Sequence, residues 1–121
     1  MRVYIPLDRR GLELLGQSGE AAPGRAYAVT PAFAEAYGSD DVEELEYAAL
    51  MVAASAATDA DGHQVVLAAD VVSVGPDDDE HPATVDLEEP VPLGQVASIH
   101  VGEEGDDLAW YAPQELSDLV G

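Results

Sequence analysis

Two residues of this sequence combine chemically useful side chains with a notable position, Asp70 and His100. Asp70 interrupts the apolar run 64–74, a pattern typical of a strand covered on both faces, where an unpaired carboxylate is costly. His100 belongs to an alternating segment, 97–101, and lies opposite its inward-facing apolar residues. A carboxylate and an imidazole in one pocket can perform acid–base chemistry or bind a small ligand. Asp70 and His100 are therefore a candidate buried polar site, in a pocket between the sheet and a helix over residues 41–57.

The other interpretation of Asp70 is structural. The carboxylate then lies at the end of the strand and faces solvent, or it forms an ion pair. Its candidate partners are Arg2, Arg25 and His100. We favour this interpretation over a catalytic or metal-binding role, because the sequence places no second reactive group beside Asp70.

Motifs for catalysis or for a cofactor are missing from the sequence. The chain has no cysteine and no histidine pair at zinc-ligand spacing, so we expect no metal site and no cofactor. It has no nucleophile elbow and no glycine loop for phosphate. The serines expected outside turns, Ser55, Ser73 and Ser98, have no visible base. A non-enzymatic protein is favoured over an enzyme.

Acidic residues dominate the charge of the chain. The 121 residues contain 25 acids and 4 arginines, for a net charge of -21. Residues 1–38 hold every arginine and are neutral, so all of the net charge lies in residues 39–121. The candidate interaction surface consists of acids from three clusters and one aromatic residue that could anchor a partner: Asp40, Asp41, Glu43, Glu44, Asp77, Asp78, Asp79, Glu80, Glu103, Glu104 and Trp110.

This charge excludes several classes of partner. Direct binding of nucleic acid relies on Lys and Arg, and docking on anionic lipid requires a basic patch. Imitation of DNA is a further alternative. DNA carries about one charge per 100 Å², whereas a folded chain of this mass spreads its net charge at about one per 300 Å². DNA mimicry therefore requires the acids to gather on one face. A basic protein is the partner that this charge favours.

Length and hydropathy predict one domain over residues 1–121, in the cytoplasm. The chain has 47% hydrophobic residues, enough for a core, and no window approaches the ~20 apolar residues of a membrane helix. No signal peptide opens it, because Pro6 and Asp8 to Arg10 interrupt any apolar run. The charge opposes self-association and the apolar segment 48–57 favours it, so the oligomeric state stays open.

The hydrophobic pattern predicts an α+β fold. We expect a mixed or mainly antiparallel sheet of about five strands, with three to four helices packed mostly on one side. Ser39 or Asp40 is expected to begin the longest helix, and Asp40 and Glu43 have the spacing of a capping box. The expected helices are 9–17, 31–38, 41–57 and 113–120, and the expected strands are 2–6, 25–29, 64–74, 84–88, 97–101 and 108–111.

Six segments together resemble a known family: MRVYIP (1–6), AYAVTPAF (26–33), EELEYAAL (43–50), VVLAAD (65–70), ASIHV (97–101) and WYAPQEL (110–116). The family comprises small acidic actinobacterial proteins and is described only as a domain of unknown function. The resemblance implies an actinobacterial, cytoplasmic origin. It implies no activity, cofactor or site residue.

Three hypotheses about function follow. The first is a non-enzymatic binding or adaptor protein that docks a basic macromolecule through its acidic surface. The second is a small ligand-binding domain or enzyme with a pocket near Asp70 and His100. The third is a DNA mimic. The positions of the acidic clusters in space distinguish the three.

Overall fold

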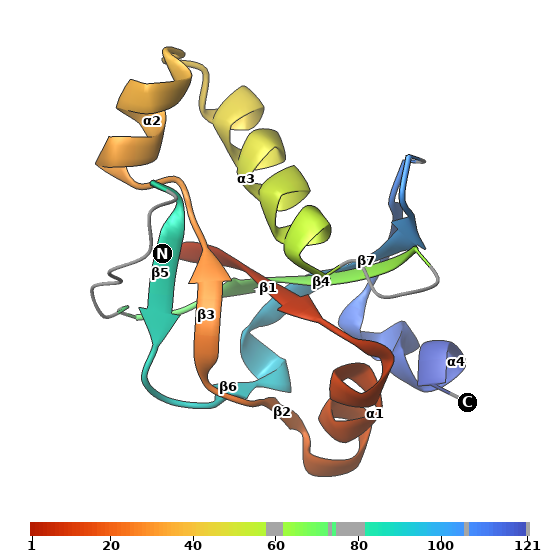
Figure 1. Ribbon diagram of the computed structural model, residues 1–121. Helices are drawn as coiled ribbons and strands as arrows, with labels where there is room; N and C mark the ends of the chain where they lie inside the picture. Colours follow the sequence, from red (N-terminus) through yellow and green to blue (C-terminus); the bar gives the residue numbers. More distant parts are fainter. Residues whose placement is uncertain (58–61, 73, 75–81, 106, 121) are drawn as a thin grey trace.

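The computed structural model describes residues 1–57, 62–72, 74, 82–105 and 107–120. Its helices are α1 (Arg9–Ser18), α2 (Pro31–Tyr37), α3 (Val42–Ala57) and α4 (Leu116–Val120), with short 3-10 helices η1 (Leu93–Gln95) and η2 (Pro113–Glu115) (Figure 1). Its strands are β1 (Arg2–Leu7), β2 (Glu20–Ala21), β3 (Gly24–Tyr27), β4 (His63–Asp70), β5 (Thr84–Leu87), β6 (Val91–Pro92), β7 (Val96–Glu103) and β8 (Ala109–Tyr111).

The strands form one six-stranded sheet in the order β5-β3-β1-β4-β7-β8 and a small two-stranded sheet of β2 and β6. Every pair is antiparallel. The α+β class is therefore confirmed, and the six expected strand segments correspond to the six strands of the main sheet. β4 occupies a central place between β1 and β7, and its residues 64–69 are all buried. That position accounts for its almost continuous apolar sequence.

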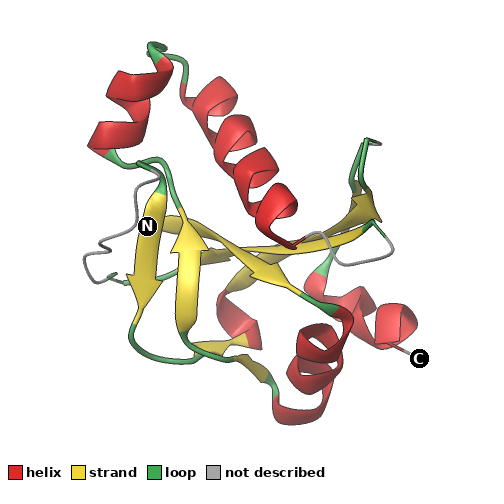
Figure 2. Ribbon diagram, viewed as in Figure 1, coloured by secondary structure: helices red, strands yellow, loops and turns green. Residues whose placement is uncertain are grey.

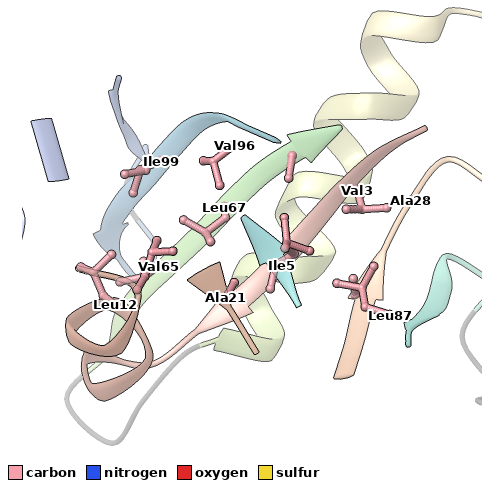
Figure 3. Packing of buried hydrophobic residues seen from close by; sticks show 14 of the residues in the cluster. Val3, Ile5, Leu12, Ala21, Ala28, Val65, Leu67, Leu87, Val96 and Ile99 are labelled. Atoms are coloured by element: carbon pink, nitrogen blue, oxygen red, sulfur yellow. The ribbon is translucent and has the colours of Figure 1, made fainter. Parts of the chain in front are cut away.

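Helices cover both faces of the sheet, and not mostly one face as the chain order suggested. Figure 2 shows α2 and α3 on one side and α1 and α4 on the other. Alternate strand residues supply the two cores: Val3, Leu67 and Ile99 pack with Leu12 and Leu15 of α1 and Leu116 of α4, whereas Tyr4, Val66 and Ala68 pack beneath α2 and α3. Figure 3 shows the first of these cores around Leu67 and Ile99. The order of elements does not specify which face a helix covers, and this detail of the prediction was wrong.

The start of α3 is set by Asp41, one residue later than predicted. The Asp41 carboxylate accepts hydrogen bonds from the backbone N–H groups of Glu43 (3.0 Å) and Glu44 (3.4 Å). These are N–H groups that a helix leaves without an intrahelical partner. Asp40 is exposed and does not form the predicted cap.

α3 lies across β1, β3 and β4 through small residues. Ala49, Ala53 and Ala54 are fully buried, which lets the helix approach the sheet closely. β7 and β8 lie beyond these three strands, at one edge of the sheet. Trp110 of β8 is 63% exposed there. The sheet therefore offers an accessible surface beside α3.

None of the helices in the described part of the chain is long and apolar enough to cross a membrane.

Candidate functional site

A groove of about 280 Å³ lies between α3 and the neighbouring face of the sheet. The sheet contributes residues from β1, β4, β7 and β8, and α3 contributes its N-terminal half. The lining residues are Arg2, Tyr4, Glu43, Glu46, Tyr47, Leu50, Ala68, Ser98, His100 and Trp110.

Helical spacing places four of these residues on one wall. Glu46 and Tyr47 follow Glu43 by three and four positions, and Leu50 follows them by four and three, so the four residues share one face of α3. That face adjoins the buried stripe that contains Leu45 and leaves the charged side chains at the groove rather than in the core. The Glu46 side chain is half-buried, and Tyr47 is 57% exposed. The α3 wall is therefore acidic and aromatic.

Strand register supplies the opposite wall and the floor. His100 is paired with Val66 of β4 on one side and with Trp110 of β8 on the other. Ser98 is paired with Ala68, and Ala68 with Tyr4 of β1. Because side chains alternate along a strand, these paired residues all point to the α3 side of the sheet. The single tryptophan of the chain therefore lies beside the only histidine of the groove.

Asp70 forms a bidentate ion pair with Arg2. Arg2 Nε donates to Asp70 Oδ1 at 2.8 Å, and Nη2 donates to Oδ2 at 3.1 Å. The pair joins cross-strand neighbours of β1 and β4. The hydrogen bonds lower the pKa of Asp70 and raise that of Arg2. Arg2 was one of the three predicted partners, and it is the one that the structure confirms.

The candidate buried site is wrong for Asp70, whereas the favoured interpretation, an ion-paired carboxylate that faces solvent at the end of its strand, agrees with the structure. Its side chain is 61% exposed, because it is the last residue of β4, where the strand leaves the core. Asp70 does not line the groove, whereas its partner Arg2 does. Asp70 lies four positions along β4 from Val66, the partner of His100, which corresponds to about 13 Å along the strand. Asp70 and His100 thus do not form one site. Asp70 acts on the groove by holding Arg2 and, as a smaller effect, through its charge, which helps to raise the pKa of Tyr4.

His100 is half-buried in the floor of the groove, and its Nε2 lies 2.9 Å from Ser98 Oγ. Burial lowers the pKa of His100 below its usual value, and the positive charge of Arg2 adds to this effect. The imidazole is therefore neutral at pH 7. A neutral imidazole can accept one hydrogen bond and donate another.

Tyr4 completes the floor. The residue is 5% exposed, and burial raises the pKa of its hydroxyl to about 12, with the negative charge of Glu46 contributing. The hydroxyl stays protonated and can donate or accept a hydrogen bond. None of the hydrogen bonds formed within the described residues involves this hydroxyl. Because Tyr4 lines the groove, a ligand there can use the hydrogen-bonding capacity of this hydroxyl.

The predicted acidic surface is divided in the structure. Asp40, Asp41, Glu43 and Glu44 are exposed at the start of α3, and Glu103 and Glu104 are exposed at the end of β7. Of the predicted surface, only Glu43 and Trp110 line the groove. Asp77, Asp78, Asp79 and Glu80 lie outside the described residues.

Sequence reasoning missed seven residues of the groove as site residues, the apolar Leu50 and Ala68 and five with polar groups: Arg2, Tyr4, Glu46, Tyr47 and Ser98. One signal was present, because Glu43, Glu46, Tyr47 and Leu50 recur at helical spacing beside the expected inner stripe. The sequence did not show that this stripe faces His100, since strand register decides that. Among the described residues, no three His, Cys, Asp or Glu side chains are grouped as metal ligands.

The fold and the groove together define a small α+β protein, with a twisted antiparallel sheet between two layers of helices and an acidic, aromatic groove beside α3. The chain belongs to a family of unknown function, DUF6912, whose family model matches residues 1–106. No curated protein and no solved structure matches the chain. The match includes every groove residue except Trp110.

Proposed function

We propose that this protein is a non-enzymatic binding protein that docks a basic segment of a protein partner, with the groove beside α3 receiving one cationic side chain. The observation that carries the proposal is the composition of the groove. Two carboxylates, Glu43 and Glu46, share it with two exposed aromatic residues, Tyr47 and Trp110. The only cation in it, Arg2, is already paired with Asp70.

Charge and aromatic character both favour a cation in this groove. A cation over an aromatic ring gains roughly 0.5–1 kcal/mol at an exposed site and about 2 when desolvated. Glu46 is half-buried, so its charge is screened less than that of a fully exposed acid. The Tyr4 hydroxyl and the Ser98–His100 pair offer further hydrogen-bond acceptors in the floor. A guanidinium, which is planar and carries five donors, matches this set better than an ammonium does.

The net charge has a separate role in the proposal. The folded chain exposes 6898 Å², and a net charge of -21 on this area attracts basic molecules over a distance of about 10 Å, the usual screening length. Such attraction increases the rate of encounter but does not choose among basic partners. We assign the choice of partner to the groove.

The spread of the acids favours this function over DNA mimicry. Asp86 lies on β5, and Glu103 lies on β7 beside β8, which places them toward opposite edges of the six-stranded sheet. A DNA mimic needs acids on one face at the spacing of phosphates. The separation of Asp86 from Glu103 across the sheet therefore favours a protein partner over DNA mimicry.

The test is calorimetric titration with a capped peptide of alternating arginine and glycine. Glu46→Gln and Tyr47→Ala are expected to weaken binding at least fivefold. Their matched controls are Glu35→Gln and Tyr37→Ala, an exposed acid and an exposed tyrosine on α2 outside the groove. If each control weakens binding as much as its groove variant, binding reflects net charge or general surface properties and the proposal fails.

A second candidate function rests on one contact. The hydrogen bond between Ser98 and His100 supplies a base to a serine for which the sequence showed none. In an enzyme or ligand-binding domain of this kind, neutral His100 would accept the hydroxyl proton while Ser98 Oγ bonds to an electrophile and its leaving group departs. A fluorophosphonate reagent tests this function by mass spectrometry, since labelling must be lost in both Ser98→Ala and His100→Gln. Absence of labelling at Ser98 in the unmodified protein excludes it.

A further inference from the structure

His100 is the one groove residue whose charge changes near neutral pH. It lies in the floor, half-buried, between Val66 and Trp110. The groups that face the groove with it are Arg2 and Tyr4 from β1, Glu43, Glu46 and Tyr47 from α3, and Ser98 from its own strand. Asp70 of β4 acts through Arg2 and lies outside the groove. The groove proposed to bind a cation therefore contains a histidine, His100, that becomes a cation itself when it is protonated.

We propose that His100 makes partner binding depend on pH, with the groove holding a cationic side chain while the imidazole is neutral and releasing it when the imidazole is protonated. This inference rests on the proposed function. Its physical basis is repulsion between two cations in a partly buried groove, where the effective dielectric constant is well below that of water. Protonation also converts His100 Nε2 from a group that can accept a hydrogen bond into one that can only donate.

The direction of the change follows from the pKa of His100. Burial and Arg2 hold this pKa below the ordinary value, about 6.5, so the neutral form predominates at pH 7. Lowering the pH from 7.5 to 5 therefore increases the fraction of imidazolium. By linkage, a bound cation must lower the pKa of His100 further, and protonation must weaken binding by the same factor.

The fluorescence of Trp110 can report both the protonation of His100 and the binding of a cation in the groove. Trp110 is the only tryptophan of the chain and the cross-strand partner of His100. We expect its fluorescence in the free protein to change with pH as His100 titrates, and to change again when a cation enters the groove. The glutamine of His100→Gln can keep a hydrogen bond to Ser98 but cannot take up a proton.

The experiment measures the affinity of the capped arginine–glycine peptide at pH 7.5 and at pH 5, at constant ionic strength. The unmodified protein is expected to bind about tenfold more weakly at pH 5. For His100→Gln the informative quantity is the ratio of its two affinities: whatever its affinity at pH 7.5, it should bind less than threefold more weakly at pH 5. His63→Gln, an exposed histidine of β4 outside the groove, is the control and should behave like the unmodified protein.

The outcomes separate this inference from the proposed function. Specific binding that is equally strong at both pH values, or a pH dependence that persists in His100→Gln, overturns the inference and leaves the proposed function in place. Binding that Glu46→Gln does not weaken, or no binding at either pH, overturns both. Loss of the pH dependence in His100→Gln alone, with His63→Gln unchanged, supports the inference.

Discussion

Replacement of Asp70 by Asn tests whether the Arg2–Asp70 pair stabilises the fold or mainly positions Arg2. Both hydrogen bonds are short and the geometry is bidentate, at 2.8 and 3.1 Å. The two side chains are however 38% and 61% exposed, so water and salt screen the pair. Exposed ion pairs contribute about 0.2–1 kcal/mol. We therefore expect Asp70→Asn to reduce the free energy of unfolding by less than about 1 kcal/mol at pH 7.

The assay is urea unfolding in a double-mutant cycle of Arg2→Met and Asp70→Asn. Removing an acid from a chain with a net charge of -21 also relieves repulsion, which would hide part of the loss. Glu35→Gln, which removes one exposed acid from α2, corrects for this effect. The coupling energy between the two positions is expected to be about 0.5–1 kcal/mol and to fall when salt is raised to 1 M.

The contribution of Asp70 to the free energy of unfolding changes with pH in a defined direction. Because Arg2 lowers the pKa of Asp70 in the folded state, this carboxylate stabilises the fold above its unfolded pKa, about 3.9. The contribution is lost as the pH falls through the folded pKa. The stability difference between the unmodified protein and Asp70→Asn should thus shrink below pH 4. A loss above 2 kcal/mol at pH 7, or a coupling energy of zero, would refute the assignment of an exposed, modest ion pair.

Three further substitutions test the packing that positions the groove. Leu67→Ala empties a fully buried site at the centre of β4 and should cost about 2–5 kcal/mol in urea unfolding; a loss below 1 kcal/mol contradicts the packing. Gly102→Ala places a Cβ 2.9 Å from Leu108 Cδ2 and 3.2 Å from the Asp107 carbonyl oxygen, so we expect about 1–3 kcal/mol of destabilisation. Gly94→Ala, with no atom within 4 Å of its Cβ, is the matched control and should be nearly neutral by the same measurement. Asp41→Ala removes the cap of α3 and should cost about 0.5–2 kcal/mol, whereas Asp40→Ala should cost much less.

Most elements of the fold could be predicted because each carries its own local signal. The apolar run that includes Val65 to Ala69 predicts a covered central strand, and β4 is such a strand. Thr30 and Pro31 predict the start of α2, and the Thr30 hydroxyl does accept a hydrogen bond from the Phe33 N–H, at 3.0 Å. Propensity and capping act within a few residues, so the sequence contains the information that specifies them.

The face that each helix covers could not be predicted, because it depends on contacts between distant segments. α1 follows β1 directly, and α4 comes about a hundred residues later, yet both pack on the same face. The register of β1 against β4 likewise decides that Arg2, rather than Arg25, meets Asp70. Three arginine or histidine partners were compatible with the sequence, and only pairing in space selects one.

The groove shows the same division between local and distant information. The stripe of Glu43, Glu46 and Tyr47 is local to α3 and visible in the sequence, whereas Ser98 and His100 are more than forty residues away. Reasoning from single residues drew attention to Asp70, whose position inside an apolar run was unusual. Of the two residues of the candidate buried site, the structure places His100 in the groove and leaves Asp70 at the end of its strand.

The distinction between net charge and site chemistry determines how the acidity should be interpreted. Twenty-one net negative charges attract any cation, so they cannot by themselves explain a choice of partner. Most of the exposed acids, such as Glu103 and Glu104, do not line the groove. Glu46 differs because it is half-buried and shares its groove with Tyr4, Tyr47 and His100. Removing one charge at Glu46 should therefore affect recognition more than removing one at Glu103, although both changes alter the net charge equally.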